Sequence, residues 1–328
     1  MRVLVTGATG FIGGHLCEAL LAGGHTIRTL ARDRVRAAGL AASGAEIVVG
    51  DLRDGDALAA AVAGVEVVFH IAALFRQENV TRAEVFAVNA AGTGSLLAAA
   101  AAAGVRRLVY CSSTGVHGDI PGRPAREDDP FEEIPGDHYQ HSKIAAERAV
   151  RRFQESRRIE TVVFRTTGAY GPRDTRFLKL FRSIARRVFV MIGSGEVPFP
   201  MIHIHDLVDG VVRCGTEPAA AGNAYFLTGD ETVSLNELAR RVAAAVGAPP
   251  PRWHVPAAPV LAAALACELI CKPLRIQPPL YRRRVNFFLL RRTFDNSRAK
   301  NDLGWAPAIA LDRGLAETAG WYRVNGML

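Results

Sequence analysis

Tyr139 and Lys143 are the two side chains whose types and spacing most clearly suggest chemistry. Residues four apart lie on one face of a helix, so a helix beginning near Tyr139 places Lys143 one turn away. A free tyrosine has a pKa of about 10 and is a poor base at neutral pH. A neighbouring ammonium favours the phenolate and lowers that pKa. The pair therefore predicts proton transfer to or from an oxygen atom of a substrate.

Ser112-Ser113 precede this pair and follow an apolar stretch, residues 107–111, that reads as a buried strand. A serine hydroxyl at the end of that strand could hydrogen-bond the same substrate oxygen. Because a Tyr-x-x-x-Lys pair arises by chance in many proteins, its meaning depends on the elements that precede it.

The first of those elements is a glycine-rich turn, Gly7-Ala8-Thr9-Gly10-Phe11-Ile12-Gly13, between an apolar strand at residues 2–6 and a helix from about Phe11. Backbone N–H groups and the positive end of a helix bind a pyrophosphate, and Gly13 allows close helix packing. The spacing is G-x-x-G-x-x-G rather than G-x-G-x-x-G. An ordinary tight turn is the alternative, but the place of this turn at the start of an alternating chain favours a dinucleotide cradle.

The second strand, residues 26–30, ends at Ala31-Arg32, where enzymes selective for NAD usually carry an acidic residue. A guanidinium can instead pair with a 2′-phosphate, so Arg32 favours NADP(H) over NAD(H). The alternative is a solvated arginine on a basic loop that also holds Arg34 and Arg36.

Two further strands are expected to end beside the cofactor. Residues 47–52 end in Asp51-Leu52, where Asp51 could accept a hydrogen bond from an adenine amino group. Residues 65–71 precede Ala72-Ala73, whose small side chains would let the backbone pass close to the cofactor, and we interpret His70 as a core histidine. The alternation of strands and helices predicts an α/β fold, a doubly wound parallel Rossmann sheet with a smaller C-terminal substrate lobe.

Composition limits the class of protein. A chain of 328 residues, 49% hydrophobic and 22% charged, is typical of one large globular α/β domain plus a lobe. The five cysteines show no metal-binding spacing, so we expect no metal. Their odd number, with a strand beginning at residue 2, favours reduced thiols and a cytoplasmic location. The net charge of +8 is spread over small arginine groups that suit a solvated surface, anionic ligands or lipid headgroups, and no nucleic-acid motif is evident.

The motifs in this order resemble those of the extended short-chain dehydrogenases/reductases, the NAD-dependent epimerase/dehydratase superfamily, over essentially the whole chain. Besides the glycine turn and the Tyr139–Lys143 pair, the matching segments are Gly50-Asp51-Leu52, His70-Ile71-Ala72-Ala73, Asn89-Ala90-Ala91-Gly92-Thr93, Ser112-Ser113, Tyr170-Gly171-Pro172, His203-Ile204-His205-Asp206 and Leu303-Gly304-Trp305-Ala306-Pro307.

The resemblance implies roles for individual residues. Tyr139 would be the general acid/base, Lys143 would also hold the nicotinamide ribose, and Ser113 would contact the substrate oxygen, with Thr114 as the second choice. Asn89 resembles the family's asparagine beneath the cofactor. The implied cofactor contacts are Gly7, Thr9, Gly10, Phe11, Ile12, Gly13, Arg32, Asp51, Leu52, Ala72, Ala73, Asn89, Lys143 and Thr166, and a homodimer is expected.

Three departures bear on the substrate. Sugar-nucleotide enzymes of the family often carry an Arg-Asp pair shortly before the His-x-x-Asp segment, and Phe199-Pro200 stand there instead. A phenylalanine cannot neutralise a diphosphate. His117 replaces a common tyrosine and Thr166 a common proline. The chain is closer in character to the branch of 3β-hydroxysteroid dehydrogenases and dihydroflavonol reductases.

The C-terminal lobe carries an apolar helix-like stretch, residues 257–271, that is too short to span a bilayer, which needs ~20 residues. Plain core packing explains much of it, and lining an apolar pocket or touching a membrane surface are the alternatives. Residues 285–290, flanked by arginines, repeat the pattern. Ser234-Leu235-Asn236-Glu237 predicts a capping box that opens a helix. We assign residues 1–172 and 201–228 to the dinucleotide-binding domain, and 173–200 and 229–328 to the substrate lobe.

These observations predict an NAD(P)-dependent oxidoreductase, with NADP(H) favoured. It would interconvert a secondary alcohol and a ketone on a bulky, largely apolar substrate of steroid, terpenoid, polyketide or acyl type. A nucleotide-sugar 4-epimerase or dehydratase with tightly bound NAD(P) is the first alternative. A non-catalytic regulator that senses the cofactor is the second, and the intact set of Ser113, Tyr139 and Lys143 argues against it.

Overall fold

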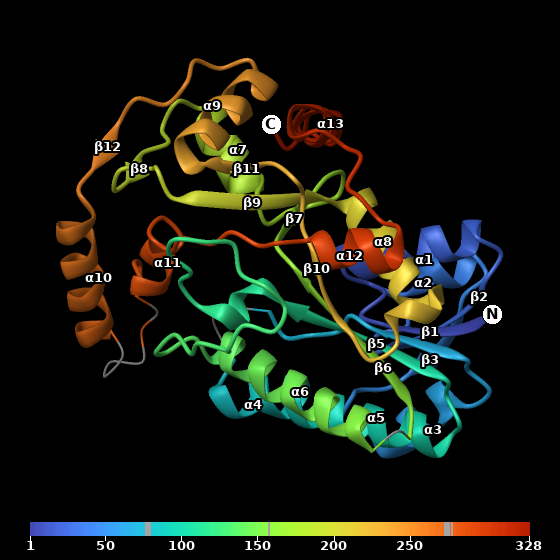
Figure 1. Cartoon of the computed structure of the whole chain (residues 1–328). Helices are drawn as coiled ribbons and strands as arrows, with labels where there is room; N and C mark the ends of the chain where they lie inside the picture. The colour runs from blue at the N-terminus through green and yellow to red at the C-terminus, as the bar shows by residue number, and fades with distance from the viewer. Residues whose placement is uncertain (76–79, 157, 272–275, 277) are drawn as a thin grey trace.

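The computed structural model of the chain describes residues 1–75, 80–156, 158–271, 276 and 278–328, with the side chains of residues 283 and 284 excepted. Its centre is a sheet of seven parallel strands in the order β10-β6-β5-β4-β1-β2-β3 (Figure 1). The strands are β1 (Arg2–Thr6), β2 (Thr26–Ala31), β3 (Glu46–Val49), β4 (Val67–His70), β5 (Arg107–Ser113), β6 (Glu160–Thr166) and β10 (Ala224–Leu227). The predicted Rossmann sheet is confirmed.

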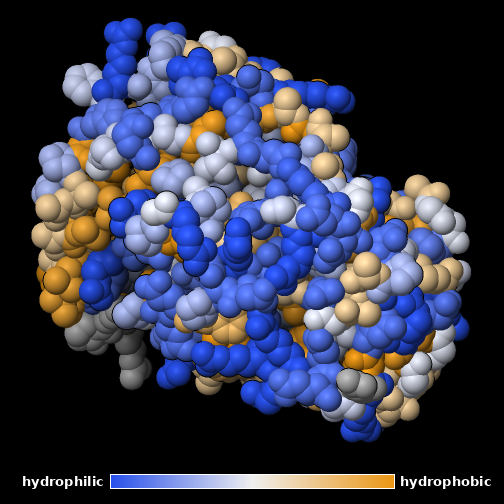
Figure 2. Space-filling view, in the orientation of Figure 1, coloured by the Kyte–Doolittle hydropathy of each residue, from blue (hydrophilic) through white to orange (hydrophobic). Residues whose placement is uncertain are grey.

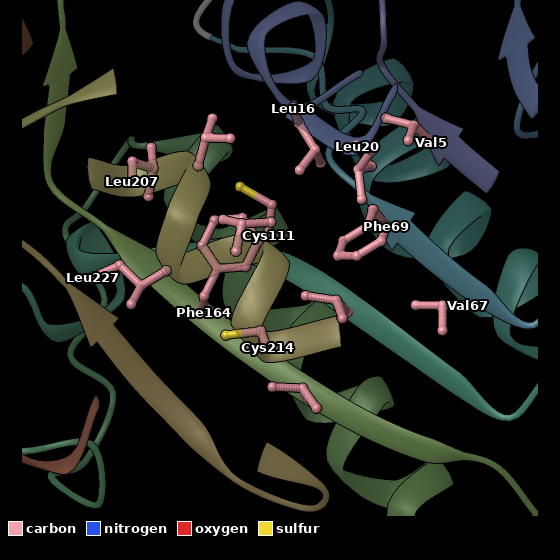
Figure 3. Packing of buried hydrophobic residues seen from close by; sticks show 14 of the residues in the cluster. Val5, Leu16, Leu20, Val67, Phe69, Cys111, Phe164, Leu207, Cys214 and Leu227 are labelled. Atoms are coloured by element: carbon pink, nitrogen blue, oxygen red, sulfur yellow. The ribbon is translucent and has the colours of Figure 1, made fainter. Parts of the chain in front are cut away.

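Helices cover both faces of this sheet because its strands are apolar on both sides. One face packs on α1 (Phe11–Ala22) and α8 (Ile204–Thr216), where the side chains of Val5, Leu16, Phe69 and Leu207 meet (Figure 3). The other face packs on α3 (Gly55–Val62), α5 (Gly92–Ala102) and α6 (His138–Glu155). The short helix α2 (Ala38–Ala42) precedes β3.

Helix α4 (Arg82–Phe86), a π-helical turn (Ala87–Ala91) and α5 run on as one apolar helix of 21 residues. Its length and composition would also suit a membrane-crossing segment, a test that core helices of soluble proteins pass as well. Here it packs against α3 and α6 in the sheet's second layer, which is the position of a core helix.

The C-terminal lobe is built on a three-stranded sheet, β11-β9-β7, and a two-stranded sheet, β12-β8. Its strands are β7 (Gly168–Tyr170), β8 (Met191–Ile192), β9 (Pro198–His203), β11 (Thr232–Ser234) and β12 (His254–Val255). Its helices are α7 (Leu178–Ala185), α9 (Leu235–Val246), α10 (Ala257–Cys271), α11 (Arg282–Asn286) and α13 (Leu311–Val324). Helix α12 (Ser297–Leu303), predicted to belong to the lobe, packs instead on β10 and α8 in the core of the seven-stranded sheet. A separate core that includes Phe181, Leu238, Leu315 and Tyr322 holds α7, α9 and α13 together. Strand β9 crosses the domain boundary predicted between residues 200 and 201.

Two local expectations about the lobe need correction. The side chain of Ser234 accepts from the N–H of Glu237 at 3.2 Å, as predicted for α9. The carboxylate of Glu237, however, pairs with Arg240 and Arg241, so only half of the capping box forms. Helix α10 is mostly exposed rather than packed in a core, and of its fifteen residues, all described, Ala264 and Glu268 are buried.

Candidate active site

The glycine turn joins β1 to α1 at the carboxyl edge of the sheet, and its geometry requires glycine at two positions. Gly7 has φ +75°, and a Cβ there would lie 2.7 Å from the backbone nitrogen of Ala72. A Cβ on Gly13 would lie 2.2 Å from the carbonyl oxygen of Gly7. The end of β4 and the start of α1 therefore pack directly against the turn, as predicted for a dinucleotide cradle.

The N-terminus of α1 is open to an anion. Among the described residues no side chain caps Gly10, and the first turn of α1 contains no acidic residue. Thr9 and Gly10 are exposed, whereas Phe11 and Ile12 are half-buried and Gly13 is buried. Because the first N–H groups of a helix lack intrahelical partners and carry partial positive charge, this end fits a pyrophosphate. A nicotinamide dinucleotide thus fits the residues present.

The adenosine side of the cradle is formed by the ends of β2 and β3. Arg32 is exposed at the end of β2. Asp51 accepts from the backbone N–H of Arg53 at 3.1 Å and from its guanidinium at 2.7 Å, and Leu52 is buried. The hydrogen bond from Arg53, with smaller contributions from other groups including the charge of Arg32, lowers the pKa of Asp51. Arg32 and Asp51 therefore lie within electrostatic range, and their contacts with a cofactor stay predictions.

His70 is a core residue, as predicted. Its ring nitrogens lie 2.7 Å from the hydroxyl of Thr6 and 2.9 Å from that of Thr93. Burial, reinforced by the charge of Lys143, lowers the pKa of His70 to about 3. The ring is therefore neutral and joins β1, β4 and α5.

Asn89 is also buried, and its amide is engaged by protein groups on both sides. The Oδ1 atom accepts from the backbone N–H of Leu74 at 2.7 Å, and Nδ2 donates to the hydroxyl of Ser142 at 3.0 Å. The side chain thereby links the loop after Ala72-Ala73 to the helix that carries Lys143. Its contact with a cofactor stays a prediction.

Helix α6 brings Tyr139 and Lys143 to the carboxyl end of β5. Asp137 caps the helix by accepting from the N–H of Gln140 at 3.1 Å. The Nζ atom of Lys143 is buried, donates to the carbonyl oxygen of Cys111 at 2.7 Å, and lies 4.8 Å from the centre of the Tyr110 ring. Burial lowers the pKa of Lys143. Tyr139 is half-buried one turn earlier, with its ring packed edge-on against Phe75 at 4.9 Å.

The two candidates for the substrate-oxygen contact behave differently. The hydroxyl of Ser113 accepts from the N–H of Gly115 at 3.1 Å and is partly exposed. The hydroxyl of Thr114 donates to the carbonyl oxygen of Thr166 at 3.1 Å and lies in the wall of the adjacent pocket. Ser113 keeps the assignment by its place in the motif, which stays a prediction, and Thr114 is placed to contact a substrate in the pocket.

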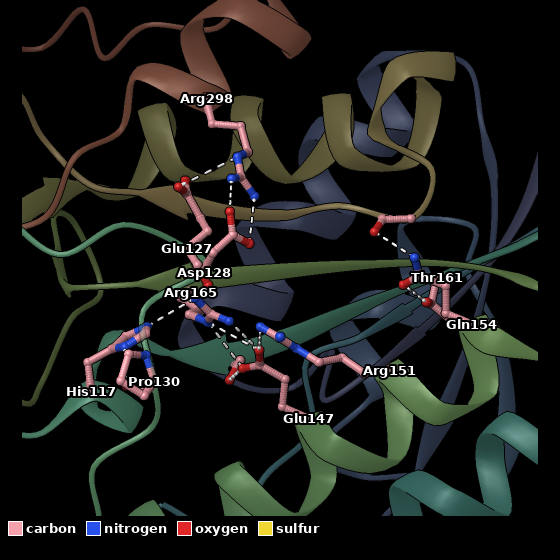
Figure 4. A network of polar contacts seen from close by, with 12 residues as sticks. His117, Glu127, Asp128, Pro130, Glu147, Arg151, Gln154, Thr161, Arg165 and Arg298 are labelled. Carbon is pink, nitrogen blue, oxygen red and sulfur yellow. Dashed lines mark hydrogen bonds and ion pairs between the residues drawn. The ribbon is translucent and has the colours of Figure 1, made fainter.

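Sequence reasoning missed a buried ionic network behind the site (Figure 4). Glu147, one turn after Lys143 on α6, accepts from Ser112 at 2.6 Å and from the guanidinium of Arg165 on β6. Both charged side chains have no exposed area. Burial alone would raise the pKa of Glu147, but the charge and hydrogen bonds of Arg165 lower it below its ordinary value. Two features of the sequence could have indicated this network. Glu147 shares a helix face with Lys143, and Arg165 interrupts an apolar strand.

His117, which stands where the family commonly has tyrosine, belongs to the same network. Arg165 donates to its Nε2 atom at 3.0 Å, so its Nδ1–H donates to the carbonyl oxygen of Pro130 at 3.1 Å. Burial, with the nearby charge of Arg165, lowers the pKa of His117 to about 4. The substitution thus supplies a neutral hydrogen-bonding ring that orients Arg165.

A pocket opens beside these residues, between the sheet and the lobe. Its wall on the side of the seven-stranded sheet includes Thr114, Thr167 and Asp137 at the start of α6, and Gly168 of β7 adjoins them. From the lobe come Pro198, Phe199 and Pro200 of β9, together with Asn286, Phe287, Leu290, Arg292 and Phe294. Of the apolar stretch at residues 285–290, for which pocket lining was an alternative to core packing, Asn286, Phe287 and Leu290 line the pocket, whereas no residue of α10 is among those that line it.

Comparisons with known proteins agree with this architecture. A model of the NAD dependent epimerase/dehydratase family matches residues 3–227. Three of the relatives that cover nearly the whole chain show the range of similar proteins. A 3-beta-hydroxysteroid dehydrogenase of Mycolicibacterium neoaurum is 32% identical over 98% of this chain and 91% of its own length. A farnesyl-dihydroquinoline-oxide ketoreductase of Stigmatella aurantiaca is 31% identical, covering 96% and 95%. A UDP-glucose 4-epimerase of Mycolicibacterium smegmatis is 33% identical, covering 98% and 99%.

Solved structures show the same fold. The crystal structure of gox2253 superposes with a TM-score of 0.84, at 30% identity, over 100% of this chain and 99% of its own. MoeE5 in complex with UDP-glucose and NAD gives a TM-score of 0.77 at 26% identity, covering 99% of each chain. Similar chains thus include proteins named for steroids and for nucleotide sugars.

Proposed function

Because the chain belongs to the NAD-dependent epimerase/dehydratase family, as an enzyme of the extended short-chain dehydrogenase/reductase type, we propose that it interconverts a secondary alcohol and a ketone on a bulky, largely apolar substrate. The reaction would be a net oxidation or reduction of that substrate. The substrate class would be steroid, terpenoid, polyketide or acyl.

The lining of the pocket supports this substrate class. Phe199, Phe287, Leu290 and Phe294 present apolar side chains, and the rings of Phe199 and Phe287 pack at 4.9 Å. Of the described residues that line the pocket, Arg292 is the one cation, and its Nε–H donates to the carbonyl oxygen of Gly118 at 2.8 Å. A nucleoside diphosphate brings two phosphate charges, and a buried charge without a partner is strongly destabilising. An apolar alcohol or ketone makes no such demand.

The catalytic groups would act on the substrate oxygen. The hydroxyl of Tyr139 would donate its proton to a carbonyl oxygen, or accept one from an alcohol in the reverse direction. The ammonium of Lys143 would favour the phenolate form of Tyr139 and would hold the nicotinamide ribose. Ser113 or Thr114 would hydrogen-bond the same oxygen. The bound cofactor supplies or accepts the hydride, so the protein needs no redox group of its own.

NADP(H) is the proposed cofactor, with NAD(H) as the alternative. Arg32 is exposed at the end of β2, where it could pair with a 2′-phosphate. The acidic residue that would accept from the ribose hydroxyls of NAD is replaced there by Ala31.

A nucleotide-sugar epimerase or dehydratase is the second candidate, and two observations favour it. Arg292 lies in the pocket wall, and the epimerase relative is as similar to this chain as the steroid dehydrogenase is. The guanidinium of Arg292 is already engaged by a backbone carbonyl, so it provides weak support for a diphosphate site. The aromatic residues of the pocket wall give stronger support for an apolar substrate.

A paired substrate panel tests the proposal. Hydroxysteroids and β-hydroxyacyl compounds would be followed by cofactor reduction, and UDP- and dTDP-sugars by chromatography of epimerised or dehydrated products. We expect turnover of an apolar alcohol or ketone. Turnover of a nucleotide sugar without activity on any apolar compound would assign the chain to the second candidate.

A further inference from the structure

Helix α10 presents an apolar surface that the described part of the chain leaves exposed. Leu269 and Ile270 are 66% and 64% exposed, and Leu265 is 40% exposed. Trp253, before the helix, and Ile276, after it, are exposed as well. In Figure 1 the helix stands at the margin of the lobe, and in Figure 2 apolar side chains gather at that margin. Exposed apolar patches of this kind mark interaction surfaces.

The orientation of this surface is fixed by an anchor on the inner side of α10. Glu268, one of the two buried residues of α10, accepts from the backbone N–H of Arg282 at 2.9 Å and from its guanidinium at 3.0 Å. Ala264, one turn earlier on the same face, is the other buried residue. Since α10 is held to α11 along this face, Leu269 and Ile270 point away from the protein.

The length of α10 determines how it can meet a bilayer. Fifteen residues of helix extend about 22 Å, less than the ~30 Å of a bilayer's hydrocarbon core. The helix is therefore too short to cross a membrane, but it could lie along one with its outer side chains among the lipid headgroups and upper acyl chains.

The charge of the surrounding sequence favours a lipid surface over a second copy of this chain as the partner of α10. Residues 257–292 contain seven lysines or arginines and a single acidic residue, Glu268. Glu268 pairs with Arg282, and Asp119 from another segment pairs with Arg291, so the stretch keeps an excess of positive charge beyond these two ion pairs. A second copy of this chain would bring the same positive charge to the contact, which disfavours self-association through this surface. An anionic lipid surface attracts it.

From these observations we propose that α10 docks the enzyme on a bilayer surface that bears anionic lipid headgroups. The docking itself does not depend on the substrate. If the proposed function holds, it also explains delivery: α10 packs on α11, and Asn286, Phe287 and Leu290, at the end of α11 and just beyond it, line the pocket. An apolar substrate dissolved in the membrane would then be close to the pocket.

Flotation with vesicles tests the docking without any assay of turnover. The full chain would be mixed with phosphatidylcholine vesicles containing phosphatidylserine, and with vesicles of phosphatidylcholine alone. We expect binding to the anionic vesicles that weakens as salt increases, and at least tenfold weaker binding to the neutral ones. In Leu269→Glu/Ile270→Glu, binding to anionic vesicles should fall at least tenfold, since burial of one such side chain corresponds to roughly tenfold or more in affinity.

Val324→Glu is the matched control, because Val324 is an exposed apolar residue at the end of α13, away from α10. This variant should bind vesicles like the wild type, and circular dichroism should show that all three proteins are folded. Equal vesicle binding by the double variant and the wild type would overturn the proposal. Failure of the wild type to bind anionic vesicles would also overturn it. If the wild type also forms a dimer in sedimentation, and the double variant does not, the surface is a subunit contact instead.

Discussion

Two cations, Lys143 and Arg32, stand at the candidate site in different surroundings. The ammonium of Lys143 is held by the carbonyl oxygen of Cys111, one helical turn from Tyr139, so its position does not depend on a bound ligand. Arg32, in contrast, is exposed on the rim of the cradle, where a ligand can engage it. These two cations are therefore expected to contribute to catalysis and to cofactor choice, respectively.

Substitution Arg32→Ala should weaken NADPH binding and spare NADH binding. A charge-assisted hydrogen bond to the 2′-phosphate contributes about 1.5–3 kcal/mol, or about one to two decades in affinity. Fluorescence titration of both cofactors measures the effect. Equal losses for the two cofactors would show that Arg32 does not read the phosphate.

The buried ring of His117 should make stability depend on pH. Its pKa is lowered to about 4 in the folded protein, against about 6.5 in an unfolded chain. Between these values the unfolded chain binds more protons, so folding stability is full above pH 6.5 and is lost as the pH falls toward 4. From pH 6.5 to pH 5 this one residue should account for a loss of roughly 1.5 kcal/mol.

Denaturant unfolding of wild type and His117→Tyr across this range checks the expectation, with His254→Gln, at an exposed position, as control. The tyrosine variant should show a shallower fall in unfolding free energy from pH 6.5 to 5, and the control should follow the wild type. Parallel curves for all three proteins would mean that His117 is not held neutral by the fold.

Among the elements, the cradle depends on how closely α1 approaches the glycine turn. Gly13→Ala should weaken cofactor binding at least tenfold and lower stability by about 1–3 kcal/mol, because its Cβ would lie 2.2 Å from the carbonyl oxygen of Gly7. At the neighbouring Gly14 a Cβ would meet the nearest atom at 3.5 Å, so Gly14→Ala should keep binding and gain up to about 1 kcal/mol of helix stability. Thermal unfolding and cofactor titration compare the two variants, and equal behaviour would refute the close-packing argument.

The Glu147–Arg165 pair joins α6 to β6 behind the catalytic pair. Glu147→Gln should destabilise the fold by about 3–5 kcal/mol, because it leaves the guanidinium of Arg165 buried without its counter-ion. Arg151 contacts the same carboxylate from the exposed side. The substitution Arg151→Ala should therefore lower the free energy of unfolding by less than about 1 kcal/mol. Urea unfolding distinguishes the two, and a loss for Glu147→Gln as small as that for Arg151→Ala would contradict the assigned role.

The elements also show which features were predictable from the sequence. Strands β1 to β5 and the turn at Gly7 were predictable because apolar runs and glycine positions reflect local backbone requirements. The exposure of α10 was not, since an apolar helix has the same composition whether or not a neighbouring element covers it. The Glu147–Arg165 contact was also not predictable, because it depends on two elements meeting in space.

On the scale of the whole molecule, helix α6 and strand β5 position Tyr139 and Lys143, and the lobe supplies most of the pocket wall. Phe199, Phe287 and Leu290 come from segments far apart in the sequence, so a pocket shared by them could be recognised only in the folded chain. The sequence did indicate that Phe199 stands where a cation would serve a diphosphate. A homodimer stays a prediction, to be checked by sedimentation in the absence of lipid.

Hydride transfer to an apolar ketone, with Tyr139 supplying the proton, is the central claim, and isotope transfer measures it directly. NADPH carrying deuterium at the transferable position of C4 would be incubated with the enzyme and the ketone identified in the substrate panel, and the alcohol product analysed by mass spectrometry. With the wild-type enzyme we expect one deuterium at the carbinol carbon of the product. Tyr139→Phe should retain NADPH binding and form product ~10²–10⁴-fold more slowly. Undiminished turnover by that variant would show that Tyr139 is not the proton donor. Epimerisation of a nucleotide sugar, with no label entering any apolar product, would show that the enzyme does not reduce an apolar ketone.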